Sequence, residues 1–409
     1  MEYQTRIEFF GRRTKNIRNL AKGQKTYAGS EAASSRTNLK LVLAILGAAG
    51  AWSGSSFAQQ SNVTIYGLVD VGVEYSSSGK GGLVREVSGG SMGSRVGFRG
   101  TEELGGGLSA TFRLEQGFTA DDGVLSQGGR IFGREASVGL SSKAYGTVLA
   151  GRLPTPYYQA LNGVDAFSWV GSGGMLSVTR SAVTSQQLLP LATSARADNA
   201  IGYTAPAFGG LELKVMGALG EGSATIGRHY SAALRYRQGP VDAIAAYARQ
   251  NGAGGSGDIT AFVVGGSYDL GPLRLYAGHT REKNACSSCT GGLARAAGIV
   301  AGGASEFGLT NLGMKVPLGA TTVFAQVTRI DDRSRYAADP GSRDATWFGV
   351  GAEHSLSKRT ALYATAATVG NRNGSSYALG SGTAQQAANA VGPNNPRAKT
   401  AVIGIRHVF

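Results

Sequence analysis

The connections between the strand-like segments of this chain alternate between short and long, and this pattern constrains the fold more than any other feature. Apolar and polar residues alternate over segments of about ten residues, as in strands with one apolar face. Seven tight turns join these segments in pairs, at 103–107, 142–146, 206–210, 238–240, 270–272, 317–320 and 356–359. Eight longer polar connections separate the pairs, near 76–90, 120–130, 153–196, 220–228, 250–258, 284–305, 331–344 and 371–398. The sequence therefore predicts an all-β fold, a transmembrane antiparallel β-barrel of about 16 strands with short turns at one end and long loops at the other.

The first segment, residues 63–74, indicates which face of the strand meets lipid. Val63 and Ile65 share one face, whereas Asp70 and Glu74 share the other. Lipid does not tolerate two carboxylates, so we expect the acidic face to line the inside of the barrel. Aromatic residues near strand ends are candidates for the belts at the two membrane interfaces, namely Tyr203, Phe208, Tyr236, Tyr268, Tyr276, Phe348 and Tyr363.

The last segment, residues 399–409, alternates in the same way and finishes on Phe409. Ile403 and Ile405 lie on the face of Phe409, and Arg406 lies on the opposite face. The ends of soluble domains are usually loose and polar. We expect this strand to pair with the strand that contains Val63, because a barrel in lipid must leave no unpaired edge.

The composition fits a barrel with a wet interior. The 409 residues include 64 glycines, and only 42% of the residues are apolar. A water-filled barrel needs no solid core, because its apolar band faces lipid. A glycine-rich chain of low complexity is the alternative interpretation, and the regular alternation of the strand segments disfavours it.

The pattern of the N-terminal part of the chain is typical of a targeting segment. Residues 41–51 form a short apolar run, too short to span a bilayer, and basic residues precede it. Small residues follow at the positions that signal peptidase reads, so we predict cleavage between Ala58 and Gln59. The chain then divides into an N-terminal extension with a signal peptide, 1–58, and a barrel domain, 59–409.

Two cysteines, Cys286 and Cys289, lie in a loop rich in small residues. A redox site would need a neighbouring βαβ pattern, and a zinc site would need two further ligands. The remaining interpretations are a local disulfide in an oxidising compartment or no functional role.

The sequence gives little support to other classes of function. The net charge is +14, but the arginines are spread singly over strands rather than clustered as in a nucleic-acid interface. No histidine falls near a nucleophile elbow or a second metal-type residue, and the four are His229, His279, His354 and His407. We therefore expect no enzyme, no nucleic-acid partner, no cofactor and no metal.

Seven stretches, in order along the chain, resemble the Gram-negative general porins, especially those of β-proteobacteria. They are Val63–Asp70, Ser94–Leu108, Leu114–Phe118, Ala136–Leu140, Leu149–Arg152, Leu356–Tyr363 and Gly404–Phe409. The resemblance implies a homotrimer of sixteen-stranded barrels in the outer membrane, with the long third loop folded into the pore. It also implies contact with lipid and lipopolysaccharide, assembly by the barrel-assembly machinery, and a role for Phe409 as the assembly signal.

The resemblance also implies a set of residues at the pore constriction. In porins similar to this one, arginines on the wall face acids on the third loop. Matched motif by motif, the candidates here are Arg95, Arg134, Arg196, Arg152, Arg113, Glu115 and Asp165. Asp165 is the only acid between 153 and 195, so the loop departs from the acid-rich version found in many general porins.

The expected function is a general diffusion porin that passes small hydrophilic solutes and ions. Charged rings in a pore set ion preference, and arginine rings favour anions, so we expect weak to moderate anion selectivity. Two alternatives remain open. One is a substrate-specific porin for small anionic metabolites, and the other is a surface barrel or adhesin with no open pore.

Overall fold

The computed structural model describes eleven stretches of the chain. These are 62–77, 82–168, 171–175, 178–180, 195–220, 228–251, 258–283, 306–333, 344–372, 377–379 and 397–409. The predicted targeting segment, with Ala58 and Gln59, lies outside the described residues, and so do Cys286 and Cys289. The predictions of cleavage and of a local disulfide therefore stay predictions.

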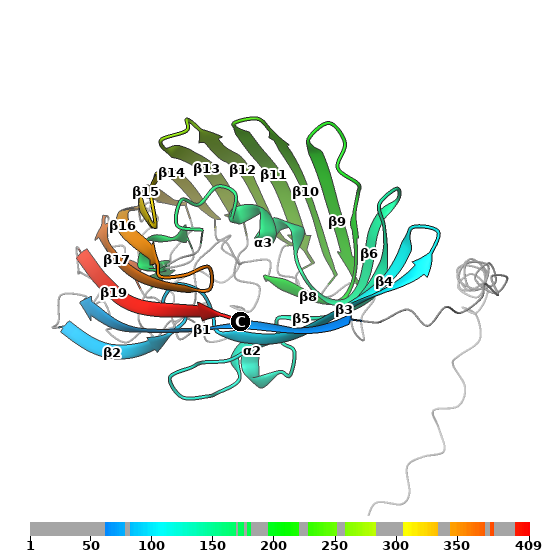
Figure 1. Ribbon diagram of the computed structural model, residues 1–409. Coiled ribbons are helices and arrows are strands. Elements are labelled where there is room, and N and C mark those ends of the chain that lie inside the picture. The colour runs from blue at the N-terminus through cyan, green and yellow to red at the C-terminus, as the bar shows by residue number, and fades with distance from the viewer. Residues whose placement is uncertain are drawn as a thin grey trace, which may run out of the picture. The chain divides into compact units, whose positions relative to one another are not determined.

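Sixteen strands close a barrel in which every neighbour is antiparallel (Figure 1). The strands are β1 (Asn62–Ser77), β3 (Arg95–Gly105), β4 (Leu108–Gly117), β5 (Glu135–Ser142), β6 (Gly146–Pro154), β8 (Arg196–Thr204), β9 (Leu211–Ala218), β10 (His229–Gln238), β11 (Val241–Gln250), β12 (Ile259–Asp269), β13 (Arg274–Lys283), β14 (Glu306–Leu318), β15 (Thr321–Asp332), β16 (Ala345–Ser355), β17 (Thr360–Asn371) and β19 (Arg397–Val408). The predicted fold class is confirmed.

In the described parts of the connections, six further elements are present. They are the strands β2 (Gly82–Ser88), β7 (Val178–Arg180) and β18 (Tyr377–Leu379), the short helices α2 (Ser126–Gly129) and α3 (Pro156–Leu161), and the 3₁₀ turn η1 (Gly171–Gly173). β7 and β18 pair with each other as a separate two-stranded sheet. Among the described residues, no helix is both long and apolar enough to cross a membrane.

The first and last strands close the wall. Leu68 of β1 stands opposite Val408 of β19. One residue further on, the amide of Gly67 donates to the carbonyl of Phe409 at 3.2 Å, and the amide of Phe409 donates to the carbonyl of Gly67 at 3.0 Å. The predicted pairing of the terminal strand with the first strand is confirmed, and it removes the unpaired edge.

Strand β1 changes its partner along its length. Its first half pairs with β3 and its second half pairs with β2. The buried carboxylate of Asp70 stands at the change and accepts from the amides of Ser91 (3.1 Å) and Met92 (2.7 Å) and from the hydroxyl of Tyr363 (2.6 Å). Asp70 therefore fixes the bend between β2 and β3 against the wall.

The two faces of the strands follow the predicted alternation. Val63 and Ile65 are exposed on the outside, whereas the side chains of Asp70 and Glu74 are completely buried. Not every aromatic residue follows its predicted place, because Tyr276 and Tyr363 are buried rather than exposed in a belt. For Tyr363 the reason is its hydrogen bond to Asp70, which requires the ring to point inward.

The seven predicted tight turns each join two consecutive strands. The turn between β12 and β13 is an example, because the amide of Leu270 donates to the carbonyl of Leu273 at 2.9 Å. Gly271 takes a φ of +89° there, which a residue without a Cβ adopts at little cost. The long connections lie at the opposite ends of the strands, as the sequence predicts.

Candidate functional site

The connection between β6 and β8, residues 155–195, lies in part against the inner wall of the barrel. Its helix α3 begins after Thr155, whose hydroxyl accepts from the amide of Tyr158 at 3.2 Å. The helix contacts β10 and β11. The amide of Tyr157 donates to Ser231 Oγ, and its hydroxyl donates to Glu282 Oε1, both at 3.0 Å. These contacts tie the start of the loop to the wall.

The middle of the same loop forms hydrogen bonds with later strands of the wall. Asn311 of β14 donates to the carbonyl of Val164 at 2.6 Å. Trp347 of β16 donates from Nε1 to the carbonyl of Gly173 at 3.1 Å. Gly349 lets the loop approach closely, because a Cβ at that position would lie 2.6 Å from the Cα of Gly173. The loop is therefore held along the inner wall from β9 to β19.

Asp165 lies inside this loop. Its side chain is completely buried, and it accepts from the amide of Phe167 at 3.0 Å and from the amide of Met175 at 3.1 Å. The resemblance implied an acid that faces the arginines across the pore. The structure instead shows a carboxylate that binds the backbone of its own loop, so its evident contribution is to the shape of the loop.

Four of the predicted arginines come together on the other side of the barrel, and we call them the arginine cluster: Arg95, Arg134, Arg152 and Arg196. Arg134 precedes β5 and donates from Nε to Glu115 Oε1 at 2.6 Å. Arg95 interacts electrostatically with both Arg134 and Glu115. The second oxygen of Glu115 accepts from the hydroxyl of Tyr66 at 2.9 Å. Glu115 therefore lies within the cluster.

The other two arginines of the cluster are oriented by backbone carbonyls. Arg196 donates from Nε to the carbonyl of Arg134 at 2.8 Å, and Arg152 donates from Nε to the carbonyl of Gly133 at 2.8 Å. Asp198 bridges Arg152 at 2.5 Å and Arg130 at 2.7 Å. The sequence analysis did not identify Asp198 and Arg130 as site residues. For Asp198, the available signal was its position two residues after Arg196.

A tyrosine of the loop faces the arginine cluster. The guanidinium carbon of Arg196 lies 5.6 Å from the ring centroid of Tyr158, a distance at which a cation interacts favourably with the ring face. Burial raises the pKa of Tyr158, and the charges of Arg196, Arg134 and Arg95 oppose that rise. Sequence reasoning missed Tyr158, because nothing in the local pattern separates it from Tyr157.

Arg113 lies apart from the cluster on the same wall. It forms an ion pair with Glu135 at 3.3 Å, and Ser137 donates to the same carboxylate at 2.8 Å. Arg113 shares its face of β4 with Glu115, as the alternation predicted, but Glu135 neutralises it locally.

The charges of the cluster do not balance. The four arginines of the cluster and Arg130 carry five positive charges, and Glu115 and Asp198 carry two negative charges, so the net charge is +3. Within the described ranges, neither Arg95 nor Arg196 forms an ion pair with an acid. The arrangement can therefore attract anions, because arginine stays charged at any working pH. In the same part of the chain, no group of three histidine, cysteine or acidic side chains could hold a metal ion.

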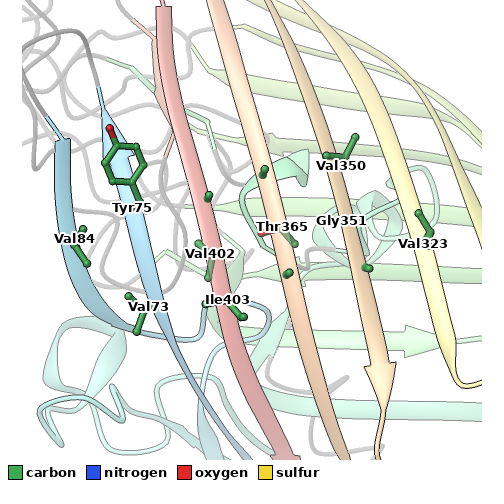
Figure 2. A pocket seen from close by; sticks show the side chains of 13 residues that line it. Val73, Tyr75, Val84, Val323, Val350, Gly351, Thr365, Val402 and Ile403 are labelled. Carbon is green, nitrogen blue, oxygen red and sulfur yellow. The ribbon is translucent and has the colours of Figure 1, made fainter.

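A second feature lies on the outer wall and takes no part in the cluster. It is a shallow apolar hollow over β1, β2, β15, β16, β17 and β19 (Figure 2). Val73, Val84, Val350 and Ile403 line it, and each is exposed on the outside of the barrel. A surface of this kind suits lipid tails or another apolar protein surface.

Comparison with known proteins agrees with the resemblance found in the sequence. A model of the Gram-negative porin family matches residues 43–374. Outer membrane porin protein 32 of Delftia acidovorans is 33% identical over 90% of this chain and 99% of its own length. An outer membrane porin of Bordetella pertussis is 28% identical over 76% of this chain and 90% of its own length.

Solved structures give the same result. The anion-selective porin from Comamonas acidovorans superimposes with a TM-score of 0.67 at 29% identity, over 86% of this chain and all of that chain. The trimer form of OmpT of Vibrio cholerae has a TM-score of 0.57 at 16% identity, over 85% of this chain and 99% of that chain, a likeness of fold alone. The closed barrel of sixteen strands and the family match over most of the sequence lead to one conclusion: the chain belongs to the Gram-negative porins, the channel proteins of the outer membrane.

Proposed function

We propose that this porin is a general diffusion channel for small hydrophilic solutes and ions, with a weak to moderate preference for anions. The observation that carries the proposal is the excess positive charge of the arginine cluster. Neither Arg95 nor Arg196 forms an ion pair with an acid among the described residues. The loop 155–195 contains no acid besides Asp165, which is buried, and it presents Tyr158 to the cluster.

The physical basis of the preference is a local positive potential. A permeating anion is attracted by the unpaired guanidiniums, and a cation is repelled. Water fills a pore of this kind and dissolved ions screen the charges, with a Debye length of about 10 Å at 0.1 M salt. The preference is therefore expected to be modest and to fade as the salt concentration rises. The relative from Comamonas acidovorans, which is named as anion-selective, supports the same direction.

The proposed constriction consists of the arginine cluster with Glu115 and Tyr158, and Arg113 contributes more weakly because it is paired with Glu135. Asp165 acts indirectly through the shape of the loop. No step of this function requires catalysis.

The proposed assembly is a homotrimer in lipid and lipopolysaccharide, inserted by the barrel-assembly machinery. The exposed apolar residues of the outer wall, such as Ile65 and Ile403, support contact with lipid or a neighbouring subunit. The proposed mature protein is the barrel domain 59–409, after cleavage at Ala58.

Planar bilayers test the function directly. Purified protein is inserted into a bilayer between two KCl solutions of different concentration, and the reversal potential is measured at low and at high salt. We expect stepwise conductance with a reversal potential on the anion side that declines toward 1 M salt. A cation-side potential at low salt would reject the charge argument, and an absence of conductance steps would favour a closed surface barrel.

A further inference from the structure

The directions of Arg152 and Arg196 depend on a short stretch of backbone. Each donates from Nε at 2.8 Å, Arg152 to the carbonyl of Gly133 and Arg196 to the carbonyl of Arg134. Both acceptors belong to the connection between β4 and β5, just before β5 begins. If residues 132–134 moved, each guanidinium would lose one of its orienting contacts and keep the other, which is Asp198 for Arg152 and the ring of Tyr158 for Arg196.

This stretch of backbone is strained. Phe132 takes a φ of +54°, in the left-handed region that residues with a side chain rarely adopt. Such a conformation is unfavourable and persists only where the surroundings enforce it. Some contact must therefore hold Phe132 and the two carbonyls that follow it.

Gln116 supplies such a contact. Its Oε1 accepts from the amide of Phe132 at 2.5 Å, and its Nε2 donates to the carbonyl of Gly117 at 2.5 Å. The side chain is buried, at 8% exposed. The amide of Arg134 also donates to the carbonyl of Glu115 at 3.1 Å, so the stretch is held at both ends. Gln116 is uncharged and lies outside the arginine cluster.

We propose that Gln116 is a positioning residue for ion preference. It fixes residues 132–134, and their carbonyls in turn aim Arg152 and Arg196 at the solute path. The inference rests on the proposed anion-preferring channel. In most pores, charged side chains at the constriction set the ion preference directly. Here a neutral side chain outside the arginine cluster would influence that preference, because it fixes the direction of two of the arginines.

The variant Gln116→Met tests the inference. Methionine has nearly the same length and leaves every charge in place, but its thioether sulfur is only a weak acceptor for the amide of Phe132, and it offers no donor to the carbonyl of Gly117. We expect the reversal potential in a KCl gradient to shift toward zero relative to the wild type. The protein should still run as a folded, heat-modifiable barrel, because the strand ladder does not involve this side chain.

A second background shows whether Gln116 acts through the two arginines. In the variant Arg152→Gln/Arg196→Gln, adding Gln116→Met should produce no further shift. An equal shift in both backgrounds would mean that Gln116 acts by another route, and it would overturn the inference. An unchanged potential in the single variant would overturn it as well.

Ser88→Ala is the matched control, because Ser88 Oγ accepts from the amide of Ala120 at 2.7 Å and holds the same connection at its other end. This neutral change should leave the reversal potential at the wild-type value, and a shift as large as that of Gln116→Met would reject a specific role for Gln116. If Gln116→Met fails to fold, Gln116→Asn tests the same restraint, because asparagine carries the same amide group on a side chain one methylene shorter, which leaves the amide of Phe132 without its acceptor. A shift toward zero then supports the inference, and no shift overturns it. Anion preference of the wild type is a separate result that tests the proposed function alone.

Discussion

Arg134 Nε lies 2.6 Å from Glu115 Oε1, so the single acid of β4 that reaches the arginine cluster neutralises one arginine within it. The other oxygen of Glu115 is occupied by the hydroxyl of Tyr66. The carboxylate is thus held by two donors from different strands. Its charge sets how much of the positive field of the cluster remains for solutes.

Replacing Glu115 by Gln should increase the anion preference. The change removes one negative charge and releases Arg134 from its ion pair, so the local positive potential rises. The reversal potential in a KCl gradient at about 0.1 M, where the Debye length is about 10 Å, measures the shift. Glu135→Gln is the control, because it makes the same change of charge beside Arg113, which is about half exposed and better screened. An equal shift in both variants would argue against a special role for the cluster.

Replacing Arg95, Arg134 and Arg196 together by Gln should move the reversal potential toward the cation side. Three fixed positive charges are lost while the strand ladder is unaffected, since substitutions inside a barrel tune selectivity. The shift should be clear at about 0.1 M salt and small at 1 M, where the Debye length is about 3 Å. No shift at low salt would show that these arginines do not face the solute path.

Gly349→Ala should lower the single-channel conductance. The new Cβ would lie 2.6 Å from the Cα of Gly173, so the loop 155–195 must move away from the wall and further into the barrel. Gly370→Ala is the control, because its Cβ would meet only a carbonyl oxygen at 3.8 Å. Equal conductance in both variants would contradict the close approach of the loop to β16.

Deletion of Phe409 should sharply reduce the amount of folded protein in the outer membrane while secretion continues. The deletion removes the last residue that pairs with Gly67, and an unpaired backbone group in lipid costs about 2–7 kcal/mol. Heat-modifiability on gels, with antibody detection of the membrane fraction, measures the yield. Phe409→Tyr should retain most of it, because the backbone pairing and the terminal aromatic ring both remain. Normal yield in the deletion would contradict the prediction.

The mature protein should begin at Gln59 or Gln60. The short apolar run 41–51 and the small residues up to Ala58 form the expected substrate of signal peptidase. N-terminal sequencing of protein from outer membranes gives the answer. Peptides from residues 1–35 in that material would refute the cleavage.

The strands were predictable from sequence because lipid imposes a simple rule on them. Each strand has one face in lipid, so apolar side chains recur at every second position, as they do at Val63 and Ile65. Turns were predictable for a similar local reason, because glycine and proline mark positions such as Gly271 that ordinary residues avoid. The inward direction of Asp70 and Glu74 followed from the same alternation.

The parts that escaped prediction depend on partners far away in the sequence. Tyr363 was expected in an aromatic belt, but its hydroxyl binds Asp70, which lies 293 residues earlier. Tyr157 and Tyr158 are neighbours in sequence, yet the first binds Glu282 and the second faces Arg196, and only the placement of the helix decides between them.

Hydrogen bonds from side chains to backbone carbonyls also could not be predicted from the sequence. Arg152 and Arg196 bind carbonyl oxygens, which every residue carries, so no motif announces the partner. The motifs located the arginines through their family pattern. They did not indicate which of them an acid neutralises, as Glu135 does for Arg113.

The one-sided attachment of the loop 155–195 has a consequence for the route of a solute. The described part of the loop is fastened to strands from β9 to β19, and the arginine cluster lies on the part of the wall from β3 to β8. A molecule that passes at this level has the arginine cluster with Tyr158 on one flank and the rest of the loop on the other. A solute with a charged end and a neutral end would therefore be turned sideways during passage, its negative end toward the strands that come first in the chain.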